Sequence, residues 1–442
     1  MDDLFIARLS FAQSLAFHIV FAAIGIGMPL LMVIAEALWL RTNDKVYLNL
    51  AKRWATGTAI LFAVGAVSGT AIAFELGLLW PGFMRYAGAI IGMPFSMEGF
   101  AFFTEAIFLG IYLYGWDKVP PRAHLFAGVL VAVSGALSGI FVVTANSWMN
   151  SPSGFRLENG VPVDIDPIAA MFNPGWVHQT LHMTIAAYMA TSAGVAGVHA
   201  FMLLRHRGSV FHRRALAISL TVLGTMSLLQ PLSGDLNARY TARNQPEKLA
   251  AMEGQFETER GAPLRIGGIP DMKTGTVPYA IEIPYGLSLL AFHDPHAEIK
   301  GLNDFPPDER PNATVVHIAF QIMVGCGMAL LLVSIWSALA AWRKRGVPEN
   351  PWLLKALIVC APLGFIAIEA GWTVTEVGRQ PWVIYRVLRT ADAVTPMPGL
   401  IVPFVTFSLI YIFLTFVVVA LLKRQIVFTD PDGNPAEASH GS

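Results

Sequence analysis

The chain has 442 residues, of which 55% are hydrophobic and only 14% are charged, and its formal net charge is zero. Its mean hydropathy is +0.55. This composition is too apolar and too poor in charge for an ordinary soluble protein. Because the basic residues lie in short loops and form no basic patch, the sequence also indicates no nucleic-acid partner. The sequence therefore predicts an all-α polytopic membrane protein that is surrounded by a lipid bilayer.

Nine apolar windows are long enough to cross a hydrocarbon core of about 30 Å at about 1.5 Å per residue. They lie near residues 11–38, 54–79, 94–115, 124–146, 176–204, 215–233, 313–341, 353–372 and 399–422. The first window has neither a basic segment before it nor a small-residue cleavage site, so we expect it to be retained as a span. The sequence predicts a bundle of nine transmembrane helices with the two termini on opposite sides.

Lysine and arginine residues gather in alternate loops, after each odd-numbered window. These basic side chains are Arg41, Lys45, Lys52, Arg53, Lys118, Arg122, Arg205, Arg207, Arg213, Arg214, Arg343, Lys344, Arg345, Lys423 and Arg424. Short loops rich in lysine and arginine remain in the cytoplasm. We therefore expect the N-terminus outside and the C-terminus inside.

One polar segment, residues 234–312, interrupts the pattern of spans and short loops, and it lies on the outer side of the predicted topology. A connection of this length is usually functional or disordered. Leu249, Met252 and Phe256 recur at helical spacing and predict a short amphipathic helix over 247–257. We expect residues 1–442 to form a single membrane domain with a disordered tail at 429–442. The two cysteines fall inside spans and indicate neither a disulfide nor a CxxC metal site.

Residues that can bind metal or carry protons gather at one depth, in the outer half of the predicted bundle. They are His18, Glu98, Glu105, His178, His182, Met323, Glu376 and Arg379. Ionisable groups inside spans are costly and often functional. Imidazole and thioether groups on separate helices are typical axial ligands of haem iron, whereas a zinc site would show closely spaced Cys or His ligands. Arg379 is suited to binding a haem propionate through two hydrogen bonds.

Each of these residues also has an ordinary structural explanation. A lone His in a span is often a hydrogen-bonded packing residue, and a Met more often fills a gap than binds a metal. His178 and His182 share a helix face, so only one of them need be a ligand. Four further residues are expected to lie at a membrane interface or within reach of one: Glu36, Glu75, His124 and His199.

Glu98 and Glu105 are seven residues apart, which places them on one helix face about 10 Å apart along the axis. Carboxyl groups spaced in this way can pass protons along a helix. The alternative is a pair that is neutralised by hydrogen bonds. We favour the proton relay.

In the outer segment, Lys248, Glu253 and Glu257 offer the donors and acceptors that a quinol head group needs, with a Glu as base for the phenolic proton. Judged by residue type and spacing alone, a solvated helix face is the favoured interpretation of these three residues.

The chain resembles, over nearly its whole length, subunit I of the cytochrome bd-type quinol oxidases, and six segments that match in order and in topological placement carry the resemblance. They are Ala145-Asn-Ser-Trp-Met149, Val177-His-Gln-Thr-Leu-His182 with Tyr188, Lys248-Leu-Ala-Ala-Met-Glu253, Ala280-Ile-Glu-Ile-Pro-Tyr285, Ala319-Phe-Gln-Ile-Met-Val-Gly-Cys-Gly327 and Gly371-Trp-Thr-Val-Thr-Glu-Val-Gly-Arg-Gln-Pro-Trp382. The last of these is highly specific. The resemblance implies a quinol:oxygen oxidoreductase in the bacterial cytoplasmic (inner) membrane.

The resemblance also implies three haems near the outer face. His182 and Met323 match the ligands of a low-spin haem b. His18 and Glu376 match the ligands of two high-spin haems, a haem b and either a haem d or a further haem b; we assign His18 to the haem that binds O2. Trp372 and Arg379 are expected to lie beside the haems.

Further matches concern proton and quinol chemistry. Glu98, Glu105 and Ser138 match the family's proton path, and Lys248 and Glu253 match its quinol-oxidising loop. The implied protein partner is a second polytopic subunit, joined in some members by a very small single-span subunit. Protons taken from the cytoplasm and released outside would generate a proton motive force without a pump.

The chain departs from well-known members of this family at two places. They carry an Arg where this chain has Gln321, and the loss of that positive charge would disfavour the reduced low-spin haem. The outer segment is also of the shorter kind, which resembles the branch that includes cyanide-insensitive oxidases.

The competing functions are a dihaem b cytochrome that only relays electrons and a proton-coupled transporter. The missing pairs of His on two helices disfavour the first, and the lack of a repeat disfavours the second.

Overall fold

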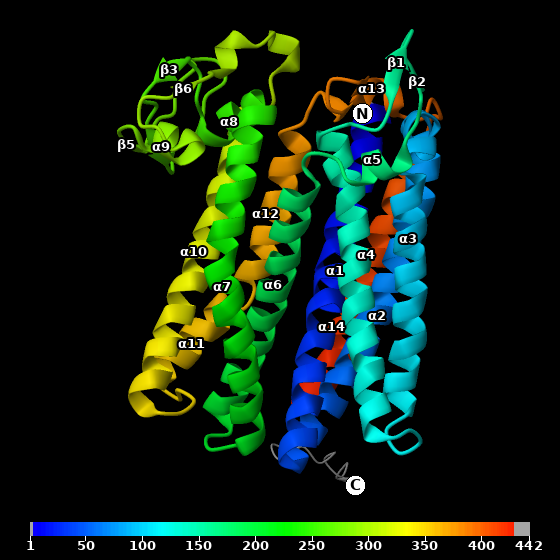
Figure 1. Cartoon of the computed structure of the whole chain (residues 1–442), viewed down its shortest axis with the longest axis vertical. Coiled ribbons are helices and arrows are strands. Elements are labelled where there is room, and N and C mark those ends of the chain that lie inside the picture. Colours follow the sequence, from blue (N-terminus) through cyan, green and yellow to red (C-terminus); the bar gives the residue numbers. More distant parts are fainter. Residues whose placement is uncertain (1–2, 428–442) are drawn as a thin grey trace.

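The computed structural model describes residues 3–427. Within these residues, nine helical segments are long and apolar enough to cross a membrane, which confirms the predicted all-α polytopic fold (Figure 1). They are α1 (Asp3–Thr42), α2 (Lys45–Leu79), α3 (Pro81–Tyr114), α4 (Pro121–Asn150), α6 (Trp176–Arg205), α7 (Val210–Asn244), α10 (Ala313–Lys344), α11 (Pro351–Cys360) continued by α12 (Leu363–Val377), and α14 (Ile401–Val427). The break in the eighth crossing falls at Pro362, because proline has no N–H for the helix ladder.

Local sequence signals set where the spans begin. Proline occupies the first position of α3, α4 and α11, where a missing N–H costs nothing. The side chains of Asp44, Ser209, Asn312 and Asn350 accept hydrogen bonds from the first-turn N–H groups of α2, α7, α10 and α11. These caps satisfy donors that the helices cannot satisfy internally.

The two ends of the bundle differ in character. We call the end that holds residues 151–175, 245–312 and 378–400 the loop end, and the end that holds residues 43–44, 115–120, 206–209 and 345–350 the basic end. Figure 1 shows the N-terminal part of α1 at the loop end and the end of α14 toward the basic end. The described ends of the chain therefore lie on opposite sides of the bundle, as predicted.

Short elements cover the loop end. Its antiparallel strand pairs are β1 (Arg156–Glu158) with β2 (Val161–Val163), β3 (Glu259–Arg260) with β6 (Glu298–Ile299), β4 (Leu264–Ile266) with β5 (Ile281–Ile283), and β7 (Trp382–Ile384) with β8 (Leu388–Arg389). Its helices are α5 (Pro167–Met171), α8 (Pro246–Glu253), α9 (Gly286–Phe292), α13 (Thr390–Ala393) and the single turns η1 (Leu302–Asp304) and η2 (Pro307–Glu309).

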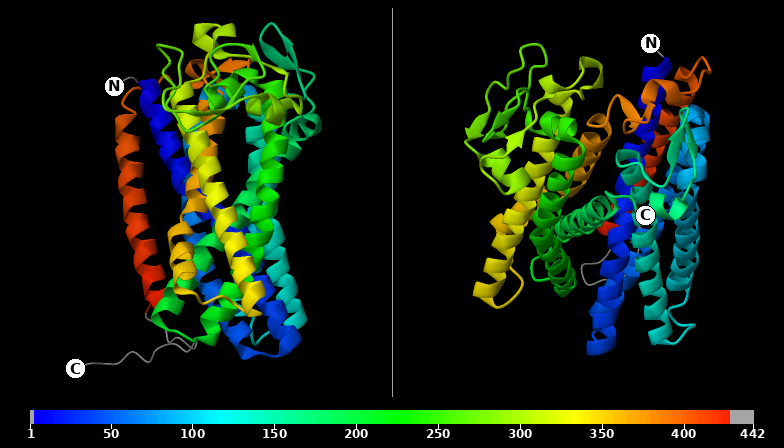
Figure 2. Two further views of the ribbon diagram at one scale, coloured as in Figure 1. Left: turned by 90° about the vertical axis from the view of Figure 1, so that its left-hand side faces the viewer. Right: turned by 45° about the horizontal axis from the view of Figure 1, so that its top comes forward.

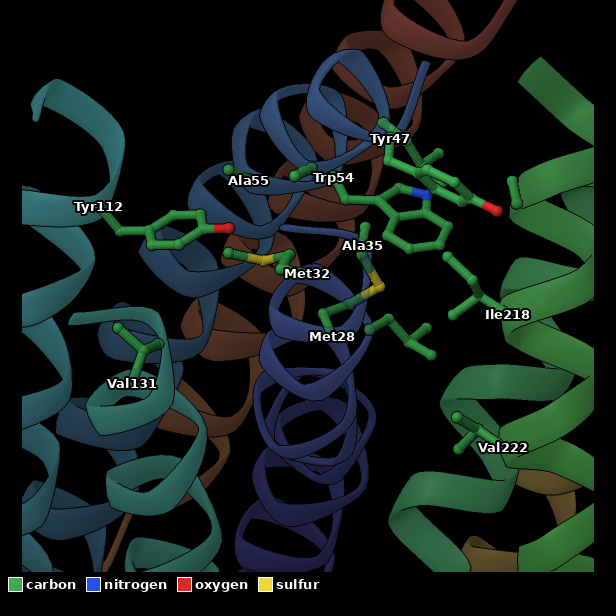
Figure 3. Close-up of a cluster of buried hydrophobic side chains, with 14 of the residues drawn as sticks. Met28, Met32, Ala35, Tyr47, Trp54, Ala55, Tyr112, Val131, Ile218 and Val222 are labelled. Carbon is green, nitrogen blue, oxygen red and sulfur yellow. The ribbon is translucent and has the colours of Figure 1, made fainter. Parts of the chain in front are cut away.

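The spans form two groups, which Figures 1 and 2 show from several sides. One group is α1, α2, α3, α4 and α14, and the other is α6, α7, α10, α11 and α12; α6 contacts both α1 and α4. Toward the basic end the groups are joined by a buried apolar cluster that includes Met28, Met32, Trp54, Tyr112 and Ile218 (Figure 3). The cavity between the groups is lined by residues from the middle of the spans to the loop end.

Two predicted boundaries in the polar segment are wrong. Helix α7 continues to Asn244, so the segment between spans begins at residue 245 and not at 234. The predicted helix over 247–257 is α8, which ends at Glu253 because Gly254 adopts a left-handed conformation with φ 63°. Phe256 is buried but lies outside the helix. The predicted disordered tail, 429–442, lies outside the described residues.

The interfacial placement predicted for four residues is also wrong. Glu36, Glu75, His124 and His199 are all buried. His124 Nδ1 lies 2.8 Å from Glu36 Oε1, Ser14 donates to Glu75 Oε1 at 2.9 Å, and Trp54 Nε1 donates to His199 Nε2 at 3.2 Å. Partners within the protein replace water, so these side chains need not reach the membrane surface.

The positive-inside rule predicts that the basic end is cytoplasmic, and this predicted orientation can be tested with single cysteines. In a Cys326→Ser, Cys360→Ser background, Tyr279→Cys at the loop end should react with a membrane-impermeant maleimide in intact spheroplasts. Arg207→Cys at the basic end should react only after the membrane is opened. Both positions are exposed. The reverse labelling pattern would contradict the orientation.

Candidate functional site

A cavity of about 1700 Å³ lies between the two groups of spans. Sites for one small molecule usually measure roughly 300–1,000 Å³, so this cavity has room for more than one large ligand. Twelve of the residues that the sequence singled out as site candidates line it. They are His18, Glu98, Glu105, Ser138, His182, Lys248, Glu253, Gln321, Met323, Trp372, Glu376 and Arg379.

The imidazole of His18 on α1 packs against Gly69 of α2. A Cβ placed on Gly69 would come within 3.0 Å of the imidazole Cε1, so a larger residue would displace the ring. Ser68 donates its single hydroxyl proton to the Val64 carbonyl at 2.9 Å and lies 3.0 Å from His18 Nδ1. In the tautomer that donates from Nδ1 to Ser68, the lone pair on Nε2 is available for a metal.

His182 of α6 repeats this arrangement against α7. Ser233 donates to the Gln230 carbonyl at 2.9 Å and lies 3.0 Å from His182 Nδ1, while Gln230 Nε2 lies 3.1 Å from His182 Nε2. In the tautomer that donates from Nδ1 to Ser233, Nε2 is unprotonated and accepts from the Gln230 amide. A Cβ on Gly234 would lie 3.4 Å from the ring. Both cavity histidines can thus present an unprotonated Nε2.

Gln321 and Met323 lie two positions apart on α10, within one turn of the helix. The thioether of Met323 lies over Gly371 of α12, where a Cβ would come within 2.9 Å of Sδ. Gln321 instead ties the polar segment to the bundle, because it accepts from Gly267 N at 3.1 Å and donates to the Arg265 carbonyl at 3.0 Å. Gln321 therefore holds strand β4 against α10, a contact that the sequence did not predict.

Glu376 and Arg379 lie at the end of α12 and form an ion pair of 2.5 Å. Asn146 of α4 donates to the other carboxylate oxygen, Glu376 Oε1, at 2.5 Å. Arg379 is 2% exposed. Among the described residues, its Nε and Nη1 have no hydrogen-bond acceptor. A buried guanidinium with two unused donors is costly unless an anion binds it.

These side chains fit haem. Two imidazoles that can present an unprotonated Nε2, a thioether and a carboxylate are all ligands that haem iron accepts, and they come from four different helices around one cavity. The unused donors of Arg379 suit a propionate group. The sequence did not predict the contacts of Ser68, Ser233 and Asn146 with these candidate ligands. A ligating histidine usually has a hydrogen-bond partner on its other ring nitrogen.

Glu98 and Glu105 lie on one face of α3, opposite α4. Ser138 donates to Glu98 Oε1 at 3.3 Å. Glu105 is 5% exposed, and a Cβ on Gly135 would lie 3.2 Å from its Oε1. Glu105 is the nearer of the two to the basic end, since α3 runs from the loop end to the basic end. The two carboxyl groups thus lie one after the other along the cavity wall, with Glu98 nearer the loop end.

Helix α8 is buried over the cavity, so the prediction of a solvated helix face is wrong for Lys248 and Glu253, each 5% exposed. Burial lowers the pKa of Lys248 to about 7; Arg379 acts in the same direction, and Glu376 and Glu247 oppose it. Burial raises the pKa of Glu253 to about 7, against the effect of Arg265. The solvated prediction failed because α8 packs against α7 and α10, and because Lys248 finds a hydrogen-bond partner in Asn150 of α4.

Glu257 and His178 lie outside this cavity lining. Glu257 is exposed and bonds Asn303 at 2.6 Å. His178 stacks on Tyr240 with ring centroids 4.8 Å apart. Of the two histidines at helical spacing, the structure thus places only His182 in the cavity wall.

Comparisons with known proteins agree with this geometry. The family model for cytochrome bd terminal oxidase subunit I matches residues 6–429. The chain is 41% identical to "Putative cytochrome bd menaquinol oxidase subunit I" of Bacillus subtilis (strain 168), over 99% of this chain and 100% of that protein. It is 32% identical to cytochrome bd ubiquinol oxidase subunit 1 of the same organism, over 96% of this chain and 94% of that one.

A solved structure is similar over almost the same length. The bd oxidase from Geobacillus thermodenitrificans superposes with a TM-score of 0.91 at 41% identity, covering 96% of this chain and 98% of that chain. The predicted family is therefore confirmed, and with it a role in haem-dependent respiration. The chain belongs to the cytochrome bd terminal oxidase subunit I family and is a multi-pass protein of the bacterial cytoplasmic membrane.

Proposed function

We propose that the chain is the haem-bearing catalytic subunit of an oxidase that oxidises quinol at the loop end and reduces O2 to water. One observation carries this proposal: the ligand-type, proton-carrying and quinol-binding candidates all line a single large cavity. An electron acceptor site, a proton path and a substrate site are the three parts that such a reaction needs.

His182 and Met323 would hold a low-spin haem b through Nε2 and Sδ, from α6 and α10. His18 would hold the haem at which O2 binds and Glu376 the second high-spin haem; one of these is haem b and the other haem d or a further haem b. Arg379 would bind a propionate, and Trp372 lines the cavity beside this set. When bound, haem supplies single-electron transfer and the iron at which O2 is reduced.

At the quinol site, Lys248 and Glu253 would both contact the quinol head group. The Lys248 ammonium would donate to a quinol oxygen, and the Glu253 carboxylate would accept the phenolic proton as general base. Both side chains are buried on α8, at the loop end. Protons from quinol would therefore leave on the outer side.

Protons for water formation would come from the basic end. They would pass Glu105 before Glu98, whose Oε1 is held by Ser138. Because uptake and release occur on opposite sides, electron transfer from quinol to O2 would generate a proton motive force without a pump. As in its family, the chain would work with a second polytopic subunit, joined in some members by a very small single-span subunit.

Optical spectra of the purified complex test the haem assignment. His182→Ala or Met323→Leu should abolish the low-spin signal in the reduced-minus-oxidised spectrum and leave CO binding, since these ligands serve only that haem. His178→Ala is the matched control, because it removes an imidazole one helical turn away that does not line the cavity. An unchanged spectrum in both ligand variants would refute the assignment.

The same spectra separate the oxidase from its alternatives. Haem that does not bind CO would favour an electron-relaying dihaem cytochrome, and absence of haem would exclude both haem functions. CO binding together with quinol-dependent O2 consumption is the result that the proposal predicts.

The buried pair on α8 predicts a bell-shaped pH profile for quinol oxidation. The Glu253 carboxylate forms as pH rises through about 7, and the Lys248 ammonium is lost above about 7, so kcat/KM should be greatest near pH 7. Glu253→Gln should remove the acid limb and lower the rate by roughly 10²–10⁴-fold. Lys248→Met should remove the alkaline limb.

Glu257→Gln is the control for this profile, because Glu257 is an exposed carboxylate close to Glu253 in sequence. Its profile should match that of the unaltered protein. If Glu253→Gln kept the acid limb, Glu253 would not be the base.

A further inference from the structure

An unbroken chain of hydrogen bonds joins the quinol-site candidate Lys248 to the iron-ligand candidate Glu376. Lys248 Nζ donates to Asn150 Oδ1 at 2.5 Å. Asn150 Nδ2 donates to Asn146 Oδ1 at 3.2 Å, and Asn146 Nδ2 donates to Glu376 Oε1 at 2.5 Å. Two asparagines, one helical turn apart at the end of α4, thus connect α8 with α12.

The ends of this chain fix the direction of every bond in it. An ammonium can only donate and an ionised carboxylate can only accept, so each amide between them must accept through Oδ1 and donate through Nδ2. Hydrogen bonds aligned in one direction polarise one another. A change at the Lys248 end therefore alters the field at Glu376 Oε1, even though the two charged groups are separated by two side chains.

Neighbouring contacts hold the asparagines in this arrangement. Gln245 Nε2 donates to the Asn150 carbonyl at 3.0 Å, and Asn150 Nδ2 also bonds the Asn146 carbonyl at 3.0 Å, within the last turn of α4. Asn150 is 1% exposed. Its side chain is thus shielded from water, which would otherwise replace either partner.

Lysine has three donors, so Lys248 can hold Asn150 and a quinol oxygen at the same time. A bound quinol would then accept a hydrogen bond from the same ammonium group that polarises the two asparagines. Helix capping alone would account for the bond from Asn150 to the Asn146 carbonyl. It would not account for the bonds to Lys248 and Glu376.

We propose that Asn150 and Asn146 are positioning residues that transmit occupancy of the quinol site to the haem held by Glu376. This inference rests on the proposed function, because it takes Lys248 as a quinol contact and Glu376 as an iron ligand. It adds a coupling between the two: a ligand at Lys248 shifts the midpoint potential of the Glu376 haem, and the shift passes through Asn150.

The test is spectroelectrochemical titration of the purified complex, with and without a saturating hydroxyquinoline N-oxide as quinol analogue. In the unaltered protein the analogue should shift the potential of the Glu376 haem. In Asn150→Leu, which has similar volume and no hydrogen-bonding groups, the shift should be lost while the haem is retained. Asn150→Asp keeps the acceptor for Lys248 but has no amide donor for Asn146, so it should also lose the shift.

Asn173→Ala is the matched control. Asn173 is 3% exposed, and its Oδ1 accepts a hydrogen bond from Ser147 of α4 at 2.7 Å. It takes no part in the chain of hydrogen bonds from Lys248 to Glu376. This variant should keep the shift.

The outcomes separate the two proposals. A shift that persists in both Asn150 variants, or no shift in the unaltered protein, would overturn the coupling. If the Asn150→Leu complex fails to assemble, the shift in haem potential is measured in Asn150→Asp: its loss supports the coupling and its persistence overturns it. Absence of haem from the unaltered protein would instead refute the proposed function.

Discussion

Every polar group in a membrane bundle must find a partner inside the protein, since hydrocarbon offers none. This constraint explains why the polar side chains that line the cavity have partners on neighbouring helices. Each cavity histidine has a serine on the facing helix, and Glu376 has both Arg379 and Asn146. The polar atoms that remain unused are the informative ones, because they indicate what else the cavity must bind.

The same constraint ties the loop end to the spans. Lys248 bonds Asn150 at the end of α4, Tyr385 donates to Glu247 at 2.6 Å, and Gln321 of α10 bonds the backbone of residues 265 and 267. These contacts connect α8, β4 and the segment after α12 to the bundle through buried polar groups. A quinol that binds at α8 would therefore act on a structure that is continuous with the ligand-bearing helices.

The sequence predicted the spans and the family well, because long apolar windows and the segment 371–382 are strong signals. Twelve of the residues that it singled out line the cavity, whereas His178 and Glu257 do not. The sequence failed where tertiary contacts override local composition. Helix α8 looks solvated by its charges, and His124 looks interfacial by its position, yet both are buried against partners far away in the sequence. The orienting serines and the Asn146–Asn150 pair have no local pattern that distinguishes them from ordinary polar residues in spans.

We propose that the cavity holds haems on His18, on His182 with Met323, and on Glu376. A cryo-electron microscopy map of the purified complex tests it most directly. The account predicts flat porphyrin densities in the cavity, with iron contacting His18 Nε2, both His182 Nε2 and Met323 Sδ, and Glu376, and a propionate on Arg379. A cavity filled by lipid or by side chains of a partner subunit would contradict it.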